Sequence, residues 1–126
     1  QTAIDKLIPT VLEVNLSQLD ANLTALVGVA KFPCPENMTI LSCFVSVTTA
    51  PTGSSAQWDI NVEGSSILTD KIIIEAGEYS SLDATTQPSF SDVTIDKGED
   101  FVIDRDAVGA TVAGQNDVLT IIYQKR

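Results

Sequence analysis

The sequence contains no histidine, which removes the side chain that most often serves as a general base, activates a nucleophile or binds zinc. Basic residues are also few, because 7 Lys and Arg stand against 17 Asp and Glu, for a net charge of −10. We therefore expect no binding to nucleic acid or to an anionic membrane. No apolar run approaches the ~20 residues of a membrane helix, and no signal-peptide pattern opens the sequence.

Cysteine is scarce as well. Cys34 and Cys43, in FPCPENMTILSC, are fewer cysteines than a disulfide-dependent secreted scaffold usually carries. Cys43 shares the parity of apolar neighbours, so we interpret it as a small buried side chain. Cys34 lies between two prolines and is interpreted as a free thiol in a loop, with a Cys34–Cys43 bridge as the open alternative. No CxxC spacing supports a metal site.

Residues that favour strands are abundant. Val, Ile and Thr supply 37 of the 126 residues. Apolar and polar residues alternate over 11–17 and most clearly over 56–63, where Trp58, Ile60 and Val62 share one parity. Similar stretches recur at intervals of roughly ten residues with turn residues between them. This pattern predicts an all-β protein, namely an antiparallel β-sandwich or jelly roll of about eight strands.

Two segments and the N-terminus need separate interpretation. Residues 39–48 place Leu41, Cys43, Val45 and Val47 on one face and Ile40 and Phe44 on the other, so we expect a central strand covered on both faces. Residues 16–27 fit either an amphipathic helix or a short helix or turn around 17–21 followed by a strand, and we adopt the second interpretation. Residues 1–10 lack a clean period, so we expect an N-terminal arm followed by one β-sandwich domain over 11–126.

Candidate chemical sites are weak. The acidic residues Asp92, Asp96, Glu99, Asp100, Asp104 and Asp106 do not have the spacing of a calcium-binding loop, and we interpret them as a solvated face. Nothing marks a carboxylate pair as that of a glycosidase. Trp58 and Tyr79 could stack on a sugar, but core packing of Trp58 is the preferred interpretation. We therefore predict a protein that is not an enzyme and that uses no cofactor and no metal.

The loops carry a resemblance to a known class of proteins. The stretch MTILSCFVSVTTAPTGSSAQWDINVEGSSIL resembles a β-sandwich module of tailed-bacteriophage virion proteins. The similarity continues through KIIIEAGEYSS, ATTQPSFSD and KGEDFVIDRDAVGATVAGQ, and it covers roughly residues 25–122. Modules of this kind occur in head decoration (cement) proteins and in tail fibres and tail tips.

The resemblance implies a function and partners. Because the chain is short and carries no fibrous shaft, we expect a decoration protein that lies on the capsid surface of the virion. It would bind the major capsid protein and stabilise the assembled shell. The alternative is a receptor- or glycan-binding module of the tail. The resemblance also implies a homotrimer, and the apolar faces of residues 39–48 give a physical reason for one.

The expected contact residues lie mainly in the arm. Ile4, Leu7 and Ile8 are apolar residues without periodic partners, so we expect them to anchor the arm on a neighbour or on the capsid. Lys6 and Arg105 are expected rim contacts, together with Lys31, Lys71 and Lys97. Arg105 has the parity of Phe101 and Ile103, where the family pattern has an aliphatic residue. Either a bulge reverses the strand there or Arg105 faces a subunit contact.

Overall fold

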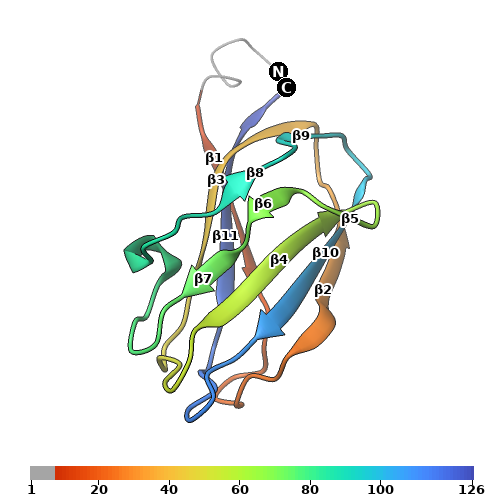
Figure 1. The fold of residues 1–126 in the computed structure, drawn as a ribbon. Helices are drawn as coiled ribbons and strands as arrows, with labels where there is room; N and C mark the ends of the chain where they lie inside the picture. Colours follow the sequence, from red (N-terminus) through yellow and green to blue (C-terminus); the bar gives the residue numbers. More distant parts are fainter. Residues whose placement is uncertain (1–7) are drawn as a thin grey trace.

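The computed structural model describes residues 8–126 and contains two antiparallel sheets packed face to face (Figure 1). This confirms the prediction of an all-β antiparallel sandwich. The expected arm lies largely outside the described residues, and the first strand begins at Thr10, which pairs with Tyr123. No helix within residues 8–126 is long and apolar enough to cross a membrane.

One sheet has four strands in the order β1-β11-β3-β9. Their bounds are β1 Thr10–Asn15, β11 Val118–Lys125, β3 Met38–Ser46 and β9 Thr94–Ile95. β9 pairs with β3 at only two positions, Met38 with Ile95 and Thr39 with Thr94. The rest of that edge of β3 therefore has no strand beside it in the described chain.

The second sheet is built around β4 and β10. It has the order β2-β10-β4-β5, and β7 also pairs with β4. The bounds are β2 Leu26–Pro33, β10 Asp100–Ala107, β4 Ala56–Val62, β5 Ser65–Ser66 and β7 Ile72–Ile74. The short strands β6 (Leu68–Asp70) and β8 (Ser89–Phe90) pair with each other, and η1 (Ser81–Asp83) is a single 3₁₀ turn. Short segments of two or three residues explain why the described strands outnumber the predicted eight.

The core lies between the two sheets. Trp58 and Ile60 of β4 face it, as the alternation predicts, and belong to one buried cluster with Phe101 and Ile103 of β10 and Leu119 of β11. Phe32 of β2 stacks on Phe101 with ring centroids 5.1 Å apart. Burial of these large apolar side chains is the main favourable contribution to folding.

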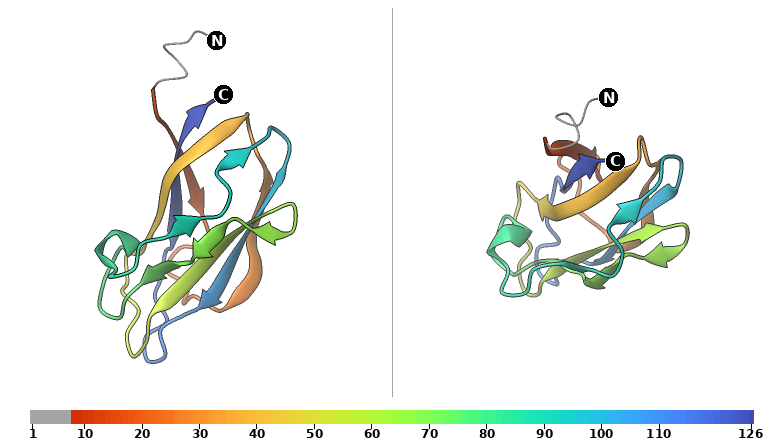
Figure 2. Two further views of the ribbon diagram at one scale, coloured as in Figure 1. Left: turned by 45° about the horizontal axis from the view of Figure 1, so that its top comes forward. Right: turned by 90° about the horizontal axis from the view of Figure 1, so that it is seen from above.

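Residues 75–93 form a long connection that we call the strap. Figure 2 shows the strap, in green to cyan, running along one side of the sandwich between β7 and β9. The side chain of Ser81 accepts a hydrogen bond from the Val45 backbone N–H, and the Tyr79 carbonyl accepts one from Val47 N–H. The strap thus replaces a neighbouring strand at one end of β3, where β9 is absent.

A bulge overturns one predicted strand face. In β3, Tyr123 pairs with Ile40 and Ile122 pairs with Ser42, so Leu41 is an extra residue. Ile40 consequently shares the core face with Cys43, and Leu41 is 46% exposed on the other face, whereas the prediction placed Leu41 on the face of Cys43. The outer face of this strand is also not covered by the described chain, contrary to expectation.

The second bulge lies in β2 between Leu26, which pairs with Arg105, and Ala30, which pairs with Ile103. Gly28 has φ +72°, and its backbone N–H donates to Asp104 Oδ1 at 2.8 Å. The strand expected after the turn is present as β2, but this bulge leaves Val27 78% exposed. The helical alternative over 16–27 is wrong, because residues 19–20 form a turn with Asp20 at φ 58°.

Candidate binding surface

One polar cluster of the sandwich, built on Arg105, is buried rather than exposed. Arg105 donates from Nε to Asp117 Oδ2 at 2.8 Å and from Nη2 to Asp117 Oδ1 at 3.0 Å. Trp58 Nε1 donates to the same carboxylate at 2.9 Å. Arg105 also donates to the carbonyls of Thr24 at 2.9 Å and Leu16 at 3.1 Å. This bidentate pair holds the loop between β1 and β2 against the core.

The cluster corrects one expected contact residue. Arg105 is 4% exposed and keeps the core parity of Phe101 and Ile103, so it cannot be a rim contact of the described surface. Neither sequence alternative foresaw this, because the partner Asp117 follows a Gly-rich loop and looks like an ordinary turn residue. Arg105 alternates in phase with the apolar residues Phe101 and Ile103, and a charged residue at such a position indicates a buried counter-charge.

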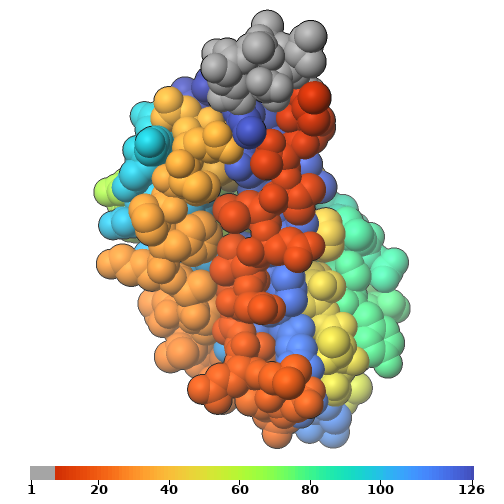
Figure 3. All heavy atoms as spheres, turned by 180° about the vertical axis from the view of Figure 1, so that it is seen from behind, coloured from red at the N-terminus to blue at the C-terminus, as the bar shows by residue number. Residues whose placement is uncertain are grey.

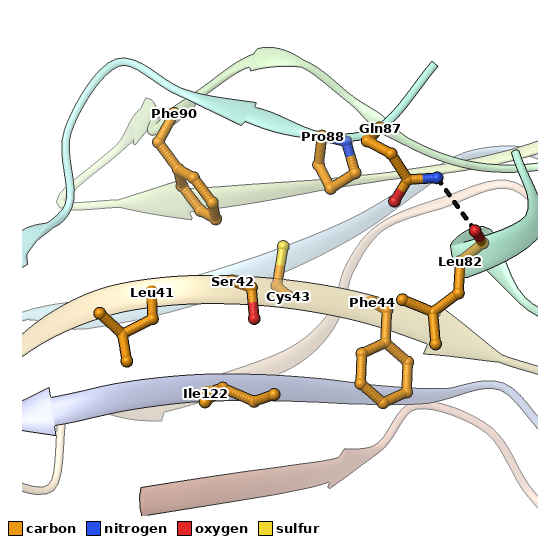
Figure 4. Close-up of a pocket in the computed structure, with 9 residues that line it drawn as sticks. All are labelled: Leu41, Ser42, Cys43, Phe44, Leu82, Gln87, Pro88, Phe90 and Ile122. Carbon is orange, nitrogen blue, oxygen red and sulfur yellow. Dashed lines mark hydrogen bonds between the residues drawn. The ribbon is translucent and has the colours of Figure 1, made fainter. Parts of the chain in front are cut away.

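One concavity lies where the strap passes the open edge of β3. It is a groove of about 440 Å³ (Figure 4). Its lining residues come from β3, β11 and the strap: Leu41, Ser42, Cys43, Phe44, Leu82, Gln87, Pro88, Phe90 and Ile122. In Figure 4, Cys43 points toward Phe90 and Pro88, whereas Leu41 and Phe44 lie on the side of Ile122. The groove is therefore apolar on both walls.

The polar groups of the groove are largely occupied. The Gln87 amide nitrogen donates to the carbonyls of Ser81 at 2.8 Å and Ala84 at 2.9 Å, so it fixes the strap. Burial raises the pKa of the Cys43 thiol to about 12, so the thiol is protonated at neutral pH and is a poor nucleophile. The groove can accept apolar side chains, but it brings together no acid, base or nucleophile.

The charge around the groove has one sign. The strap carries Glu75, Glu78, Asp83 and Asp92 and contains no Lys or Arg, and β3 has no charged residue. Asp83 follows Leu82 in η1, and Asp92 comes two residues after Phe90, so acidic residues flank two lining positions. The apolar groove thus has an acidic border on the strap side.

A second, smaller hollow of about 200 Å³ lies at the loop end of the sandwich. It is lined by Asn15, Ser17, Leu19, Thr48 and Asn116. The Asn116 amide nitrogen donates to Asp20 Oδ1 and to Thr48 Oγ1, and Asn116 Oδ1 accepts from the Asp20 backbone N–H. These bonds tie three loops together and leave amide and hydroxyl groups at the surface.

Two of the acidic residues singled out in the sequence, Asp104 and Asp106, have structural partners. Asp104 accepts from Asn61 Nδ2 at 2.8 Å and from Gly28 N–H, and Asp106 pairs with Lys71 at 2.7 Å. Over residues 8–126, no group of three or more Cys, Asp or Glu side chains is arranged to hold a metal ion. Trp58 is buried and Tyr79 is 58% exposed, so the two do not form the sugar-stacking platform considered above.

The remaining predicted contact residues are placed as follows. Ile8 is exposed, whereas Ile4, Lys6 and Leu7 lie outside the described residues. Lys31 and Lys97 are exposed, and Lys71 is an exposed partner of Asp106. Cys34 and Cys43 are both free and buried, so the alternative of a bridge between them is wrong.

Sequence reasoning missed the groove itself. Its strap residues Leu82, Pro88 and Phe90 lie in a region whose sequence has the pattern of an ordinary loop, and only the fold brings them beside β3.

Comparison with protein-family models, with curated proteins and with solved structures finds no match for the chain.

Proposed function

We propose that this chain is a structural protein of a tailed-phage virion that decorates the capsid and acts by binding rather than by catalysis. The observation that carries the proposal is the apolar groove with exposed Leu41 and Leu82 at its mouth. Contiguous exposed apolar surface of this kind marks interaction sites. The sequence resemblance of residues 25–122 supplies the class of partner, which is the major capsid protein.

The proposed mechanism is stabilisation by linkage. A protein that binds the assembled shell but not its separated subunits lowers the free energy of the shell and leaves that of the subunits unchanged. The net charge of −10 keeps free copies apart in solution. Local apolar contacts must then overcome this repulsion at the shell surface, so screening by salt changes the association rate more than the final occupancy.

Immunogold electron microscopy tests the proposal. Virions from the source of the chain are labelled with an antibody raised against the purified protein. We expect gold over the head surface, and absence of gold from the particles would reject the virion role. As the matched control, particles are treated with denaturant to remove the bound protein and are labelled before and after purified protein is added back.

The tail module remains the second candidate because of the polar hollow at the loop end. Asn15, Ser17 and Thr48 offer amide and hydroxyl groups, which are the groups that hydrogen-bond sugar hydroxyls. Gold confined to the tail tip in the same experiment would favour this candidate over decoration.

A further inference from the structure

We propose that the groove beside β3 binds an extended segment of a partner protein that presents apolar side chains flanked by Lys or Arg. The inference rests on the proposed binding function and adds the chemistry of the partner's contact. It follows from three properties of the described residues: an open strand edge, an apolar cavity and an acidic border.

The edge of β3 is open over four residues. At one end, Ile40 N–H donates to the Val93 carbonyl at 2.8 Å, and at the other, Val45 N–H donates to Ser81 Oγ at 3.0 Å. Between these two bonds, residues 41–44 make no hydrogen bond to the strap within the described chain. Five steps along a strand span roughly 16 Å, so the opening matches an extended segment of about four or five residues.

The cavity selects apolar side chains. Leu41, Phe44 and Ile122 form one wall, and Leu82, Pro88 and Phe90 form the other. Side chains of an extended segment alternate, so every second residue can enter while the others stay in water. The volume of about 440 Å³ could also suit a small molecule. However, the Gln87 amide is used by the strap, and no charged side chain lines the groove to orient such a ligand.

The border selects the charge of the segment. Exposed Asp83 and Asp92 flank the strap wall, and neither carboxylate forms an ion pair within the described chain. A segment with Lys or Arg on either side of its apolar residues would place positive charge beside these carboxylates. Attraction between the acidic border and such a segment speeds association, and repulsion disfavours segments that carry negative charge.

The test uses the full chain labelled with ¹⁵N and three synthetic peptides. The first is acetyl-Lys-Leu-Thr-Leu-Lys-amide, the second has Glu in place of both Lys, and the third has Ser in place of both Leu. We expect the first peptide to shift the amide signals of residues 41–44 and Phe90 saturably. The Glu and Ser peptides should bind at least about tenfold more weakly.

A matched pair of variants locates the site. Leu41→Glu should abolish the shifts, whereas Leu19→Glu, which changes a residue 85% exposed on the second hollow, should leave them unchanged. Saturable shifts away from the groove, or equal binding of the Glu peptide, would overturn the proposal. A chain lacking residues 1–7 identifies another occupant: if the deletion alone shifts the signals of residues 41–44, the groove holds the protein's own N-terminal segment and the proposal is wrong.

The peptide test and the immunogold test fail independently. Gold on heads without peptide binding would retain the decoration role and reject the groove as its contact. Peptide binding without gold on particles would retain the groove as a segment-binding site and reject the virion role.

Discussion

Arg105 joins parts of the chain that are far apart in sequence. Its guanidinium bonds the Asp117 carboxylate and the carbonyls of Leu16 and Thr24, and Asp117 also accepts from Trp58. Taking two charges out of water is unfavourable, and only a complete set of partners offsets the loss. The ion pair therefore favours one arrangement of this end of the sandwich, in which all of these groups are satisfied.

Replacement of Arg105 should be strongly destabilising. Arg105→Met leaves the buried Asp117 charge without its counter-ion, and we expect a loss of about 3–5 kcal/mol in the free energy of unfolding. Urea denaturation followed by Trp58 fluorescence measures the loss. Lys71→Met is the control, because its ion pair with Asp106 is exposed and should contribute no more than about 1 kcal/mol. Equal losses in the two variants would contradict the argument.

A double variant separates charge from packing. In Arg105→Met combined with Asp117→Asn, neither member of the pair is charged and the Asn side-chain oxygen can still accept from Trp58. We expect this protein to be more stable than the single Arg105→Met variant. A double variant that is less stable than the single one would show that packing, and not the unpaired carboxylate, dominates the loss.

Two buried groups make the protein sensitive to alkaline pH. Burial raises the pKa of Cys43 from 9.0 to about 12, and burial together with the hydrogen bond to Glu36 raises the pKa of Tyr123 from 10.0 to about 12. Above pH 9 the unfolded chain loses these protons before the folded chain does. The unfolded state then binds fewer protons, so the free energy of unfolding falls as the pH rises from about 9 to 12.

Urea midpoints measured between pH 8 and pH 11.5 test this dependence. Cys43→Ala and Tyr123→Phe each remove one titrating group, so each variant should lose less stability over this range than the unmodified chain. A wild-type midpoint that is constant across the range would be inconsistent with the raised pKa values.

At the scale of the elements, strand positions are adjusted by bulges and loops are held by close backbone contacts. The bulge at Leu41 turns one apolar residue outward at the groove mouth, and the bulge at Gly28 exposes Val27. The loop of residues 108–117 packs against residues 49–53 through bonds such as Thr52 N–H to the Val112 carbonyl at 2.9 Å. Gly109 lies inside this contact.

Gly109→Ala should destabilise this pair of loops. A Cβ at this position would lie 1.9 Å from the Val112 carbonyl oxygen and 2.8 Å from the Thr52 nitrogen, so the backbone must move. We expect a loss of about 1–3 kcal/mol in the free energy of unfolding, measured by urea denaturation. Gly64→Ala is the control, because a Cβ there meets nothing within 4 Å and φ +84° is its only source of strain. Gly109→Ala should be the less stable of the two.

At the scale of the whole molecule, one side of the sandwich ends in two edge strands. β1 and β2 are the last strands of their sheets. Figure 3 views this side, with β1 in red along the middle and β2 in orange next to it. Val11 and Val27 are exposed here, and an exposed strand edge is a template for pairing with another chain.

We expect this side to join copies in a homotrimer. Light scattering of the purified protein should give three times the mass of 13.4 kDa, and Val27→Asp should shift the protein to a monomer that remains folded. Because each copy has a net charge of −10, the trimer should be favoured by added salt. A monodisperse monomer at micromolar concentration and physiological salt would exclude the trimer.

Local patterns in the sequence were enough to predict the class of fold and much of its core. β-Branched residues favour strands, and the alternation of Trp58, Ile60 and Val62 predicts a half-buried strand because side chains on a strand point to opposite faces in turn. Those three residues are buried as predicted. These features depend on neighbours within a few positions, so the sequence alone contains them.

Tertiary structure decided what depends on residues distant in sequence. Arg105 is buried because Asp117 lies opposite it, and no spacing rule connects the two positions. The bulge at Leu41 arises from the register with β11, and a shift of one residue reverses which side chains face the core. The groove exists only because the strap carries Leu82 and Phe90 to the unpaired edge of β3, which is a consequence of topology and not of any local pattern.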